Sequence, residues 1–391
     1  MQGLKSSAAA ALTAVLLCAG SAPAAAVSVR RPEVRHFIAD MSARYGFNKR
    51  RLAKLLKRAQ SQPAIIEAMG RPAEKAKLWY EYRAIFVNEK RIREGAEFWL
   101  AHREELDRAS AATGVAPEYL VAILGVETSY GRLTGHYRVL DALTTLAFDY
   151  PARSKFFTEE LEQFLLLTRE SGVDPLKAMG SYAGAMGAPQ FMPSNYRRYA
   201  VDASADGRID LWSNWPDVFA SVGNYFAQFG WVSGEAVLDE ASVDPAAAPA
   251  LDGRTLGLTD TVGSLRAKGL SFESSLPADA PALLIAADEP DGVHWRVGYR
   301  NFFVITRYNH SALYAMAVYD LAAAVRQRVT QPDAAPADAA AVSAAAVATP
   351  VAGAAATAGA AAAASEAPSA AAPGANGAVA PNAGAAQPVP P

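Results

Sequence analysis

The sequence predicts a mainly helical α+β protein with one small β region towards the end of its folded part. Three observations support this prediction. Apolar residues recur at helical spacing through the first two hundred positions. Residues 234–291 instead have short apolar runs between alanine, proline, glycine and aspartate. From residue 331 the chain is almost entirely Ala, Pro, Gly, Ser and Val, which cannot bury a core. We therefore expect a folded part at 30–330 and a disordered tail at 331–391.

Residues 1–26 match an export signal. Lys5 supplies a positive charge, Ala8 to Leu17 is apolar but too short to span a bilayer, and small residues follow as cleavage sites. We expect this signal peptide to be removed. The only cysteine, Cys18, lies inside it. A lipid anchor through Cys18 is the less favoured alternative, because the large Leu17 stands where lipidation signals have a small residue.

Composition excludes several function classes. The net charge of −2 gives no reason to expect a nucleic-acid partner, and no polybasic run indicates an anionic membrane surface. The five histidines have no metal-ligand spacing, which argues against zinc. No nucleotide-binding fingerprint and no serine nucleophile motif appears.

The predicted helices follow from apolar spacing and from residues that begin or end a helix. Asn48 and Asn88 can each cap a helix, Pro117 opens one, and Pro151 separates two. The resulting helices are 32–45, 49–58, 74–86, 88–112, 117–127, 137–150, 154–169, a short one from 174, 216–229 and 311–329.

Two stretches lack the helical pattern. Residues 179–193 are rich in glycine and small residues, so we expect a loop or a broken helix there. The predicted strands are 281–287, 294–299 and 302–307, which place the small β region at 231–307.

One carboxylate ends a long apolar run. Residues 120–126 are apolar, and Glu127 follows them, before small and polar residues. A carboxylate beside a buried run is costly to ionise and tends to remain protonated, which suits a general acid. The alternative is a structural carboxylate, salt-bridged or at a helix end, on the rim of the core.

The glycine-rich stretch 180–194 is a second candidate site. Its glycines let backbone approach a ligand closely, Gln190 can both donate and accept hydrogen bonds, and Phe191 offers apolar contact. A plain connection between two helices explains the same composition.

Residues 202–210 match the start of an EF-hand loop. Oxygen-bearing side chains stand at positions one, three, five and nine, with Gly207 at six. Ser213 replaces the usual glutamate at position twelve, but Asp217 lies where a lengthened loop could close on a structural Ca²⁺. The alternative is an Asp/Gly turn without metal.

Two further groups of residues could bind a ligand. Residues 306–311 gather polar groups at a predicted strand-to-helix junction, where Asn309 or Ser311 as a helix N-cap is the simpler account. Aromatic residues suit a glycan cleft, although core packing is the commoner use of any single one. They are Tyr82, Phe148, Tyr150, Phe156, Tyr182, Phe191, Tyr225, Tyr308 and Tyr314.

Ordered motifs give a more specific indication than any single one. The chain resembles the membrane-bound lytic transglycosylase B family of bacterial periplasmic enzymes that cleave murein, over roughly residues 33–328. The motifs that carry the resemblance are GVETSYGR at 125–132, VLDALTTL at 139–146, GAMGAPQFMP at 184–193, DGRIDLW at 206–212, SVGNYF at 221–226 and ITRYN at 305–309.

The resemblance implies a lysozyme-like helical catalytic domain within a larger helical body, with the small β region and a calcium loop. It implies cleavage of the β-1,4 bond between N-acetylmuramic acid and N-acetylglucosamine, with formation of 1,6-anhydromuramic acid ends. We accordingly expect a periplasmic protein, or one anchored to the outer membrane if Cys18 is lipidated. The expected partners are peptidoglycan glycan strands and proteins of cell-wall synthesis or hydrolysis.

The resemblance also assigns roles to residues of this chain. Glu127 matches the catalytic glutamate, no catalytic cofactor is implied, and Ala188–Pro189 departs from the family pattern beside the cleft. The residues that match glycan-contacting positions are Ser181, Gln190, Phe191, Arg153, Tyr82, Tyr225, Tyr308 and Tyr314. The residues that match calcium ligands are Asp202, Ser204, Asp206, Arg208 through its carbonyl, and Asp217.

Two other functions remain open at this stage. A hydrolytic muramidase would use Glu127 with a second carboxylate that positions water. Asp141 and Asp149 lie on the following helix, where we expect them to serve structure. Without a second catalytic carboxylate, Glu127 would act as acid and base in turn. The second alternative is a non-catalytic, calcium-stabilised peptidoglycan-binding protein, which would tolerate the loss of Glu127.

Overall fold

The structure of the protein is a computed structural model that describes residues 25–70, 77–244 and 246–331. Most of the predicted signal peptide, and the predicted tail from residue 332 onwards, therefore lie outside the described residues. Strand β1 (Ala25–Ala26) spans the last two positions of the predicted signal peptide and pairs antiparallel with β2 (Gln60–Ser61).

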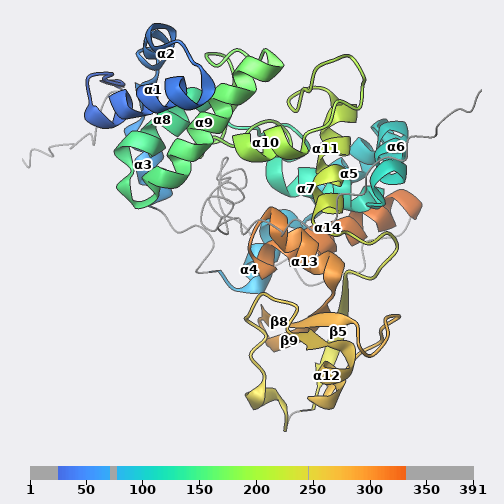
Figure 1. Cartoon of the computed structure of the whole chain (residues 1–391). Helices are drawn as coiled ribbons and strands as arrows, with labels where there is room; N and C mark the ends of the chain where they lie inside the picture. Colours follow the sequence, from blue (N-terminus) through green and yellow to red (C-terminus); the bar gives the residue numbers. More distant parts are fainter. Residues whose placement is uncertain (1–24, 71–76, 245, 332–391) are drawn as a thin grey trace, which may run out of the picture.

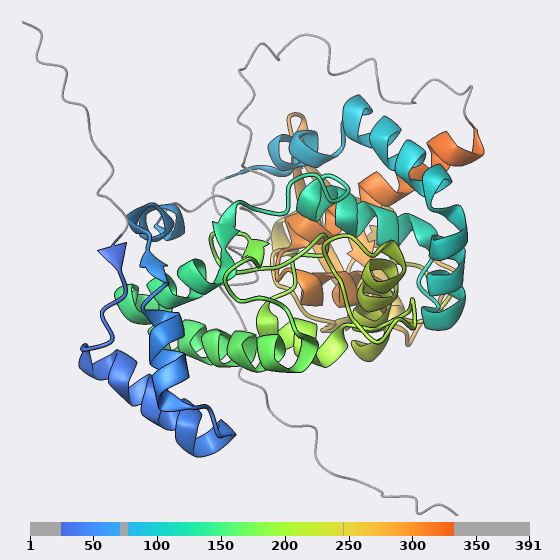
Figure 2. The ribbon, with the colours of Figure 1, turned by 90° about the horizontal axis from the view of Figure 1, so that it is seen from above.

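Helices dominate the described chain, as predicted (Figure 1). Seen from above, the blue N-terminal helices lie on one side of the green helix α9, and the cyan and orange helices lie on the other (Figure 2). The α-helices are α1 (Pro32–Tyr45), α2 (Lys49–Leu56), α3 (Pro63–Met69), α4 (Trp79–Phe86), α5 (Glu89–Ala101), α6 (Arg103–Thr113), α7 (Pro117–Thr128), α8 (Val139–Asp149), α9 (Ser154–Ser171), α10 (Pro193–Tyr199), α11 (Trp215–Gln228), α12 (Val262–Ala267), α13 (Arg300–Tyr308) and α14 (Ala312–Thr330).

Local sequence explains where several of these helices begin. The side chain of Asn48 accepts hydrogen bonds from the first turn of α2, and the side chain of Asn88 does the same for α5. Pro117 lies in the first turn of α7, where its missing N–H costs no hydrogen bond. These predictions from the sequence are confirmed.

The single helix predicted over 88–112 is wrong, because the chain bends at His102 and forms two helices, α5 and α6. The ring of His102 lies 4.7 Å from that of Phe98 and 5.2 Å from that of Trp215, measured between centroids. After this bend, α6 packs against α11. Tertiary packing therefore overrides a continuous helical pattern here.

Three other local predictions need correction. The short helix predicted from Asp174 is instead a turn, in which the Asp174 carbonyl accepts the N–H groups of Lys177 and Ala178. The helix predicted from residue 137 begins at Val139, because β3 (Tyr137–Arg138) pairs with β4 (Met179–Gly180). Helices α3 and α10 were not anticipated; each has proline in its first turn.

The predicted small β region is a five-stranded antiparallel sheet, in the order β6-β8-β9-β5-β7. Figure 1 shows it beneath α4 and α13. The register of its central hairpin pairs Leu283 with Gly298 and Glu289 with Gly292. The strands are β5 (Leu238–Val243), β6 (Asp260–Thr261), β7 (Leu270–Ser271), β8 (Pro281–Glu289) and β9 (Gly292–Gly298).

The strand predicted over 302–307 is wrong, because this segment lies within α13. Its β-branched and aromatic residues favour a strand. However, Phe302, Ile305 and Tyr308 are all buried and are three residues apart, so a helix places them on one side against the core.

Helix α7 is the most enclosed element. Leu120 to Thr128 are all buried, and α14, α5, α6 and α11 pack against this helix. An all-round apolar helix is typical of a protein core. Within the described residues, no single helix is long and apolar enough to cross a membrane. Helices α6 and α7, bent by 111° where they meet, satisfy those criteria only as a pair.

Candidate active site

Glu127 lies in the last turn of α7 with only 2 % of its surface exposed. Its Oε1 accepts a hydrogen bond of 2.6 Å from the phenol of Tyr314, on α14. Burial, with a further contribution from the negative charge of Glu127, raises the pKa of Tyr314 well above its usual value. The phenol therefore stays protonated and acts as a permanent donor to the carboxyl group.

The end of α7 fixes the place of Glu127. Ser129 and Tyr130 adopt left-handed backbone angles, with φ of 50° and 63°, and their N–H groups donate to the carbonyls of Gly125 and Leu124. These bonds close the last helical turn as in a Schellman motif. Backbone angles of this kind are unfavourable for residues other than glycine, so surrounding contacts must maintain them.

Thr128 connects this turn to the glycine-rich segment 180–194. Its hydroxyl donates to the carbonyl of Ala188 over 2.8 Å and accepts the N–H of Gly131 over 3.0 Å. Gly135 lies against Gly180, since a Cβ atom added to Gly135 would be 2.0 Å from the Gly180 carbonyl oxygen. The two segments therefore approach each other at backbone distance.

Within the glycine-rich segment, Gln190 and Ser181 are buried polar residues. Gln190 has a φ of 52°, and its Nε2 donates to the carbonyls of Gly187 and Thr134. Its Oε1 is buried and has no hydrogen-bond partner within the described residues. The Ser181 hydroxyl accepts the N–H groups of Ala183 and Ala185. The segment is thus an ordered turn with one unused acceptor.

Aromatic side chains pack behind this segment. The rings of Phe191, Tyr225 and Tyr308 lie within 5.0–5.9 Å of one another. The phenol of Tyr308 donates to the Pro189 carbonyl over 2.5 Å, and that of Tyr225 donates to the Arg307 carbonyl over 2.6 Å. Burial raises the pKa of Tyr308 well above its usual value, and the charge of Glu127 adds to the shift. These aromatics therefore support the site chiefly as its packed wall.

The other two predicted glycan-contacting residues differ in their surroundings. Tyr82 on α4 is buried, and α4 packs against α14, the helix that carries Tyr314. Arg153 lies after α8, in the 3₁₀ turn η1 (Pro151–Arg153), with its guanidinium 4.5 Å from the ring centroid of Phe156. Its Nη1 is buried and has no hydrogen-bond partner among described residues, and desolvation lowers its pKa.

The structure adds Asn309 to the candidate site. Asn309 follows Tyr308 and is 1 % exposed, yet neither its side-chain oxygen nor its nitrogen has a hydrogen-bond partner in the described part of the chain. The N-cap of α14 is Ser311, whose hydroxyl accepts the N–H of Tyr314. Burying an amide group without hydrogen-bond partners is energetically costly. The unused donor and acceptor of Asn309 therefore indicate that a ligand binds there.

The predicted calcium loop folds around two carboxylates. Asp217, fully buried in the first turn of α11, accepts the N–H groups of Ala203, Ser204 and Asp210. Asp202 accepts the N–H of Gly207 over 2.9 Å. Within the described ranges, no three His, Cys, Asp or Glu side chains are gathered as a metal site. Backbone amides therefore occupy the carboxylates that were expected to bind Ca²⁺.

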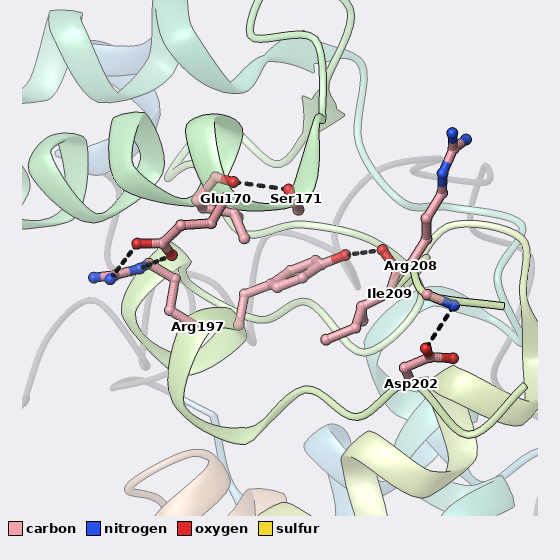
Figure 3. Close-up of a pocket in the computed structure, with 9 residues that line it drawn as sticks. Glu170, Ser171, Arg197, Asp202, Arg208 and Ile209 are labelled. Atoms are coloured by element: carbon pink, nitrogen blue, oxygen red, sulfur yellow. Dashed lines mark hydrogen bonds and ion pairs between the residues drawn. The ribbon is translucent and has the colours of Figure 1, made fainter. Parts of the chain in front are cut away.

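A pocket of about 290 Å³ opens beside this loop (Figure 3). Its walls come from the end of α9, from α10 and from the loop itself. Glu170 and Arg197 form an ion pair of 2.8 Å on one side, and Asp202 lies on the other. The pocket thus borders the loop rather than Glu127.

The chain is similar to known proteins over most of its described residues. Residues 30–323 match the family model described as a transglycosylase SLT domain. The chain is 39% identical over 309 residues to membrane-bound lytic murein transglycosylase B of Escherichia coli (strain K12), covering 75% of this chain and 82% of that protein.

Two solved structures are similar along most of their length. Soluble lytic transglycosylase SltB1 from Pseudomonas aeruginosa has 47% identity and a TM-score of 0.73, with 76% of this chain and 99% of that chain covered. The Escherichia coli lytic transglycosylase Slt35 in complex with calcium has 40% identity and a TM-score of 0.70, with coverage of 77% and 94%.

Proposed function

The chain belongs to the transglycosylase SLT domain family, and we propose that it is a lytic murein transglycosylase. The proposed reaction cleaves the β-1,4 bond between N-acetylmuramic acid and N-acetylglucosamine in peptidoglycan and leaves 1,6-anhydromuramic acid ends. The observation that carries this proposal is the buried carboxyl group of Glu127, held by the Tyr314 phenol at the end of α7.

Glu127 acts first as an acid and then as a base. Its protonated carboxyl group gives a proton to the glycosidic oxygen as the bond between that oxygen and muramic C1 breaks. The carboxylate that remains takes the proton of the muramic C6 hydroxyl, whose oxygen forms the new bond to C1. Glu127 is thereby protonated again, and no water is consumed.

The nearest acidic residues of the following helix are already engaged elsewhere. Asp141 accepts the N–H of Gln60 and pairs with Arg138 at 2.8 Å. Asp149 accepts hydrogen bonds from Ser61 and Arg31. Both carboxylates thus join α8 to the N-terminal part of the chain. This arrangement favours a mechanism with one catalytic carboxylate over the two-carboxylate hydrolysis of ordinary glycosidases.

Buried hydrogen-bonding groups without partners among the described residues suit an N-acetylated sugar. Asn309 offers a donor and an acceptor, Gln190 offers an acceptor, and both are buried in the structure. Ser181 contributes a hydroxyl, and Arg153 a buried donor for a substrate oxygen. The wall of Tyr82, Phe191, Tyr225, Tyr308 and Tyr314 would hold the site rigid around the glycan.

A structural Ca²⁺ in the 202–217 loop is a further part of the proposal. The expected ligands are Asp202, Ser204, Asp206, the Arg208 carbonyl and Asp217, all oxygen donors of the kind that Ca²⁺ prefers. Gly207 has a φ of 83°, which provides the tight turn of such loops. Bound Ca²⁺ would neutralise these carboxylates and would replace some of their bonds to backbone N–H groups. The calcium complex of the similar Slt35 protein supports this assignment.

We further propose a periplasmic location and glycan strands as the main partner. The curated relative is named as membrane-bound. Removal of residues 1–26 as a signal peptide, lipidation of Cys18 and association with cell-wall proteins stay predictions. Sequencing the N-terminus of the exported protein would distinguish cleavage near Val27 from an anchored Cys18.

Mass spectrometry of digested murein tests the proposed reaction. We expect the wild-type protein to release anhydro-ended fragments. Glu127→Gln should still sediment with insoluble murein but release none. Glu118→Gln is the matched control, because Glu118 is a buried glutamate on the same helix that pairs with Arg326. Reducing muramic ends would indicate hydrolysis, and substantial cleavage by Glu127→Gln would exclude the proposed mechanism.

A further inference from the structure

One face of α5 contacts the turn that follows Glu127. Figure 1 shows α5 beside α7, and the two helices pack together. Four residues lie on the same face of α5, because they recur within successive helical turns. They are Arg91, Glu94, Gly95 and Phe98. Glu94 pairs with Arg132, and the ring of Phe98 lies 5.4 Å from that of Tyr130. Side chains of α5 therefore hold the turn that follows Glu127.

Arg91 makes the central contact. Its Nη1 donates a hydrogen bond to the carbonyl of Gly125, two residues before Glu127. The last carbonyls of a helix carry partial negative charge, so a cation there is favourable. The backbone N–H of Arg91 donates to the Asn88 side chain, and its guanidinium lies 5.7 Å from the Phe86 ring centroid. The first contact anchors the Arg91 backbone, and the second holds its guanidinium.

Tyr130 also binds Arg91. Its phenol donates to the Arg91 carbonyl over 2.7 Å, and the residue is 5 % exposed. Two glycines make room for it. A Cβ atom on Gly95 would be 2.4 Å from the Tyr130 hydroxyl oxygen, and one on Gly125 would be 2.8 Å from its ring. Tyr130 thus holds the backbone of Arg91, while the Arg91 guanidinium holds the Gly125 carbonyl.

We propose that Arg91 is a positioning residue for the reaction and acts through the backbone of α7 on Glu127. The left-handed backbone angles of Ser129 and Tyr130 require contacts from other residues. Arg91 supplies two, because its guanidinium donates to the Gly125 carbonyl and its own carbonyl accepts the Tyr130 phenol. Without it, the last turn of α7 loosens, and the Glu127 carboxyl loses its fixed place beside Tyr314. This inference rests on the proposed role of Glu127.

Kinetics on soluble, uncrosslinked glycan strands test the proposal with three variants. Arg91→Met should lower kcat about 10- to 100-fold and leave KM within about twofold, because a misplaced acid slows the chemical step but not binding. Arg91→Lys keeps one donor and should recover part of the loss. Arg93→Met is the control, since Arg93 is an exposed residue of the same helix, 3.9 Å from Glu97.

A second variant decides the question if Arg91→Met does not fold. Tyr130→Phe keeps the ring and removes only the hydrogen bond to the Arg91 carbonyl, so it should lower kcat in the same direction. Melting curves report the folded fraction to which each kcat refers. Wild-type kcat in folded Tyr130→Phe and Arg91→Met, or a change in KM alone, would overturn the inference. An active Glu127→Gln would instead overturn the proposed function.

Discussion

The phenolic oxygen of Tyr314 lies 2.6 Å from Oε1 of Glu127, and both side chains are buried. This hydrogen bond is stronger than one between neutral groups in the step in which Glu127 is a carboxylate. It holds the carboxyl in one orientation. Five predictions follow from this contact and from other features of the structure, each with its own measurement.

Replacing Tyr314 by Phe should reduce kcat about 10- to 100-fold, because a hydrogen bond to a charged group contributes about 1.5–3 kcal/mol. The remaining ring should keep the fold. Tyr319→Phe, on the same helix, is the control and should retain the wild-type rate. Steady-state kinetics on glycan strands measure both. Equal rates for the two variants would show that the Tyr314 hydroxyl has no part in the reaction.

Replacing Asn309 by Leu should weaken glycan binding while raising the free energy of unfolding by about 1 kcal/mol, because an unpartnered buried amide is removed. Asn301→Leu provides the contrast. The Asn301 side chain bonds to the Val232 N–H and to the carbonyls of Val232 and Glu235. Its loss should cost about 2–4 kcal/mol. Denaturant unfolding measures the difference, and an equal loss in both variants would contradict the assignment of Asn309 to ligand binding.

Gly135→Ala should destabilise the protein by roughly 3 kcal/mol or more, through a φ of 98° and collision of the new Cβ with the Gly180 carbonyl. Gly172→Ala isolates the first effect. Its φ is 72°, but no atom lies within 4 Å of the added Cβ, so about 1 kcal/mol is expected. Equal losses of unfolding free energy in Gly135→Ala and Gly172→Ala would argue against the close approach of Gly135 to Gly180.

Calcium should raise the melting temperature, and a chelator should reverse the effect. At a free Ca²⁺ concentration one hundred times Kd, binding to the folded state alone stabilises it by about 2.7 kcal/mol. Asp206→Ala should abolish the shift, and Mg²⁺ at the same concentration should not reproduce it. A melting curve that is identical in calcium and in chelator would refute the proposed ion site.

Glu160→Gln should make stability less dependent on pH. Glu160 accepts hydrogen bonds from the Ser194 N–H and hydroxyl, both of which a glutamine can satisfy. Burial raises its pKa above the value of 4.5. The folded protein therefore binds the Glu160 proton more tightly than the unfolded chain does. The stabilisation that comes from protonated Glu160 is present at low pH and is lost as pH rises from 4.5 through the folded-state pKa. The variant should match the wild type at pH 4 and exceed it at pH 8 in thermal unfolding.

Some features could be predicted from short-range patterns because their causes are local. Asn48 and Asn88 begin helices through their own side chains, and Glu127 is visible as a carboxylate at the end of an apolar run. The glycine-rich segment 180–194 was expected to let backbone approach a ligand closely, which stays a prediction; its Gly180 instead lies against Gly135.

Other features depend on contacts that no spacing reveals. Tyr314 lies 187 positions after Glu127, so only the family resemblance could bring the two together before the structure did. At the bend, His102 contacts Trp215 on a helix distant in sequence. Asn309 appears in sequence as an ordinary capping residue, and only the burial of both its amide atoms without partners makes it a site candidate.

The separation of Glu127 from Tyr314 along the chain has a consequence for biosynthesis. Helix α14 packs against α4, α5 and α7, and it is the last described helix to be made. A growing polypeptide that ends before Ala312 contains the acid but lacks the phenol beside it. The proposed active site is thus assembled only after α14 has been made, and products that end before Ala312 lack the phenol that holds Glu127.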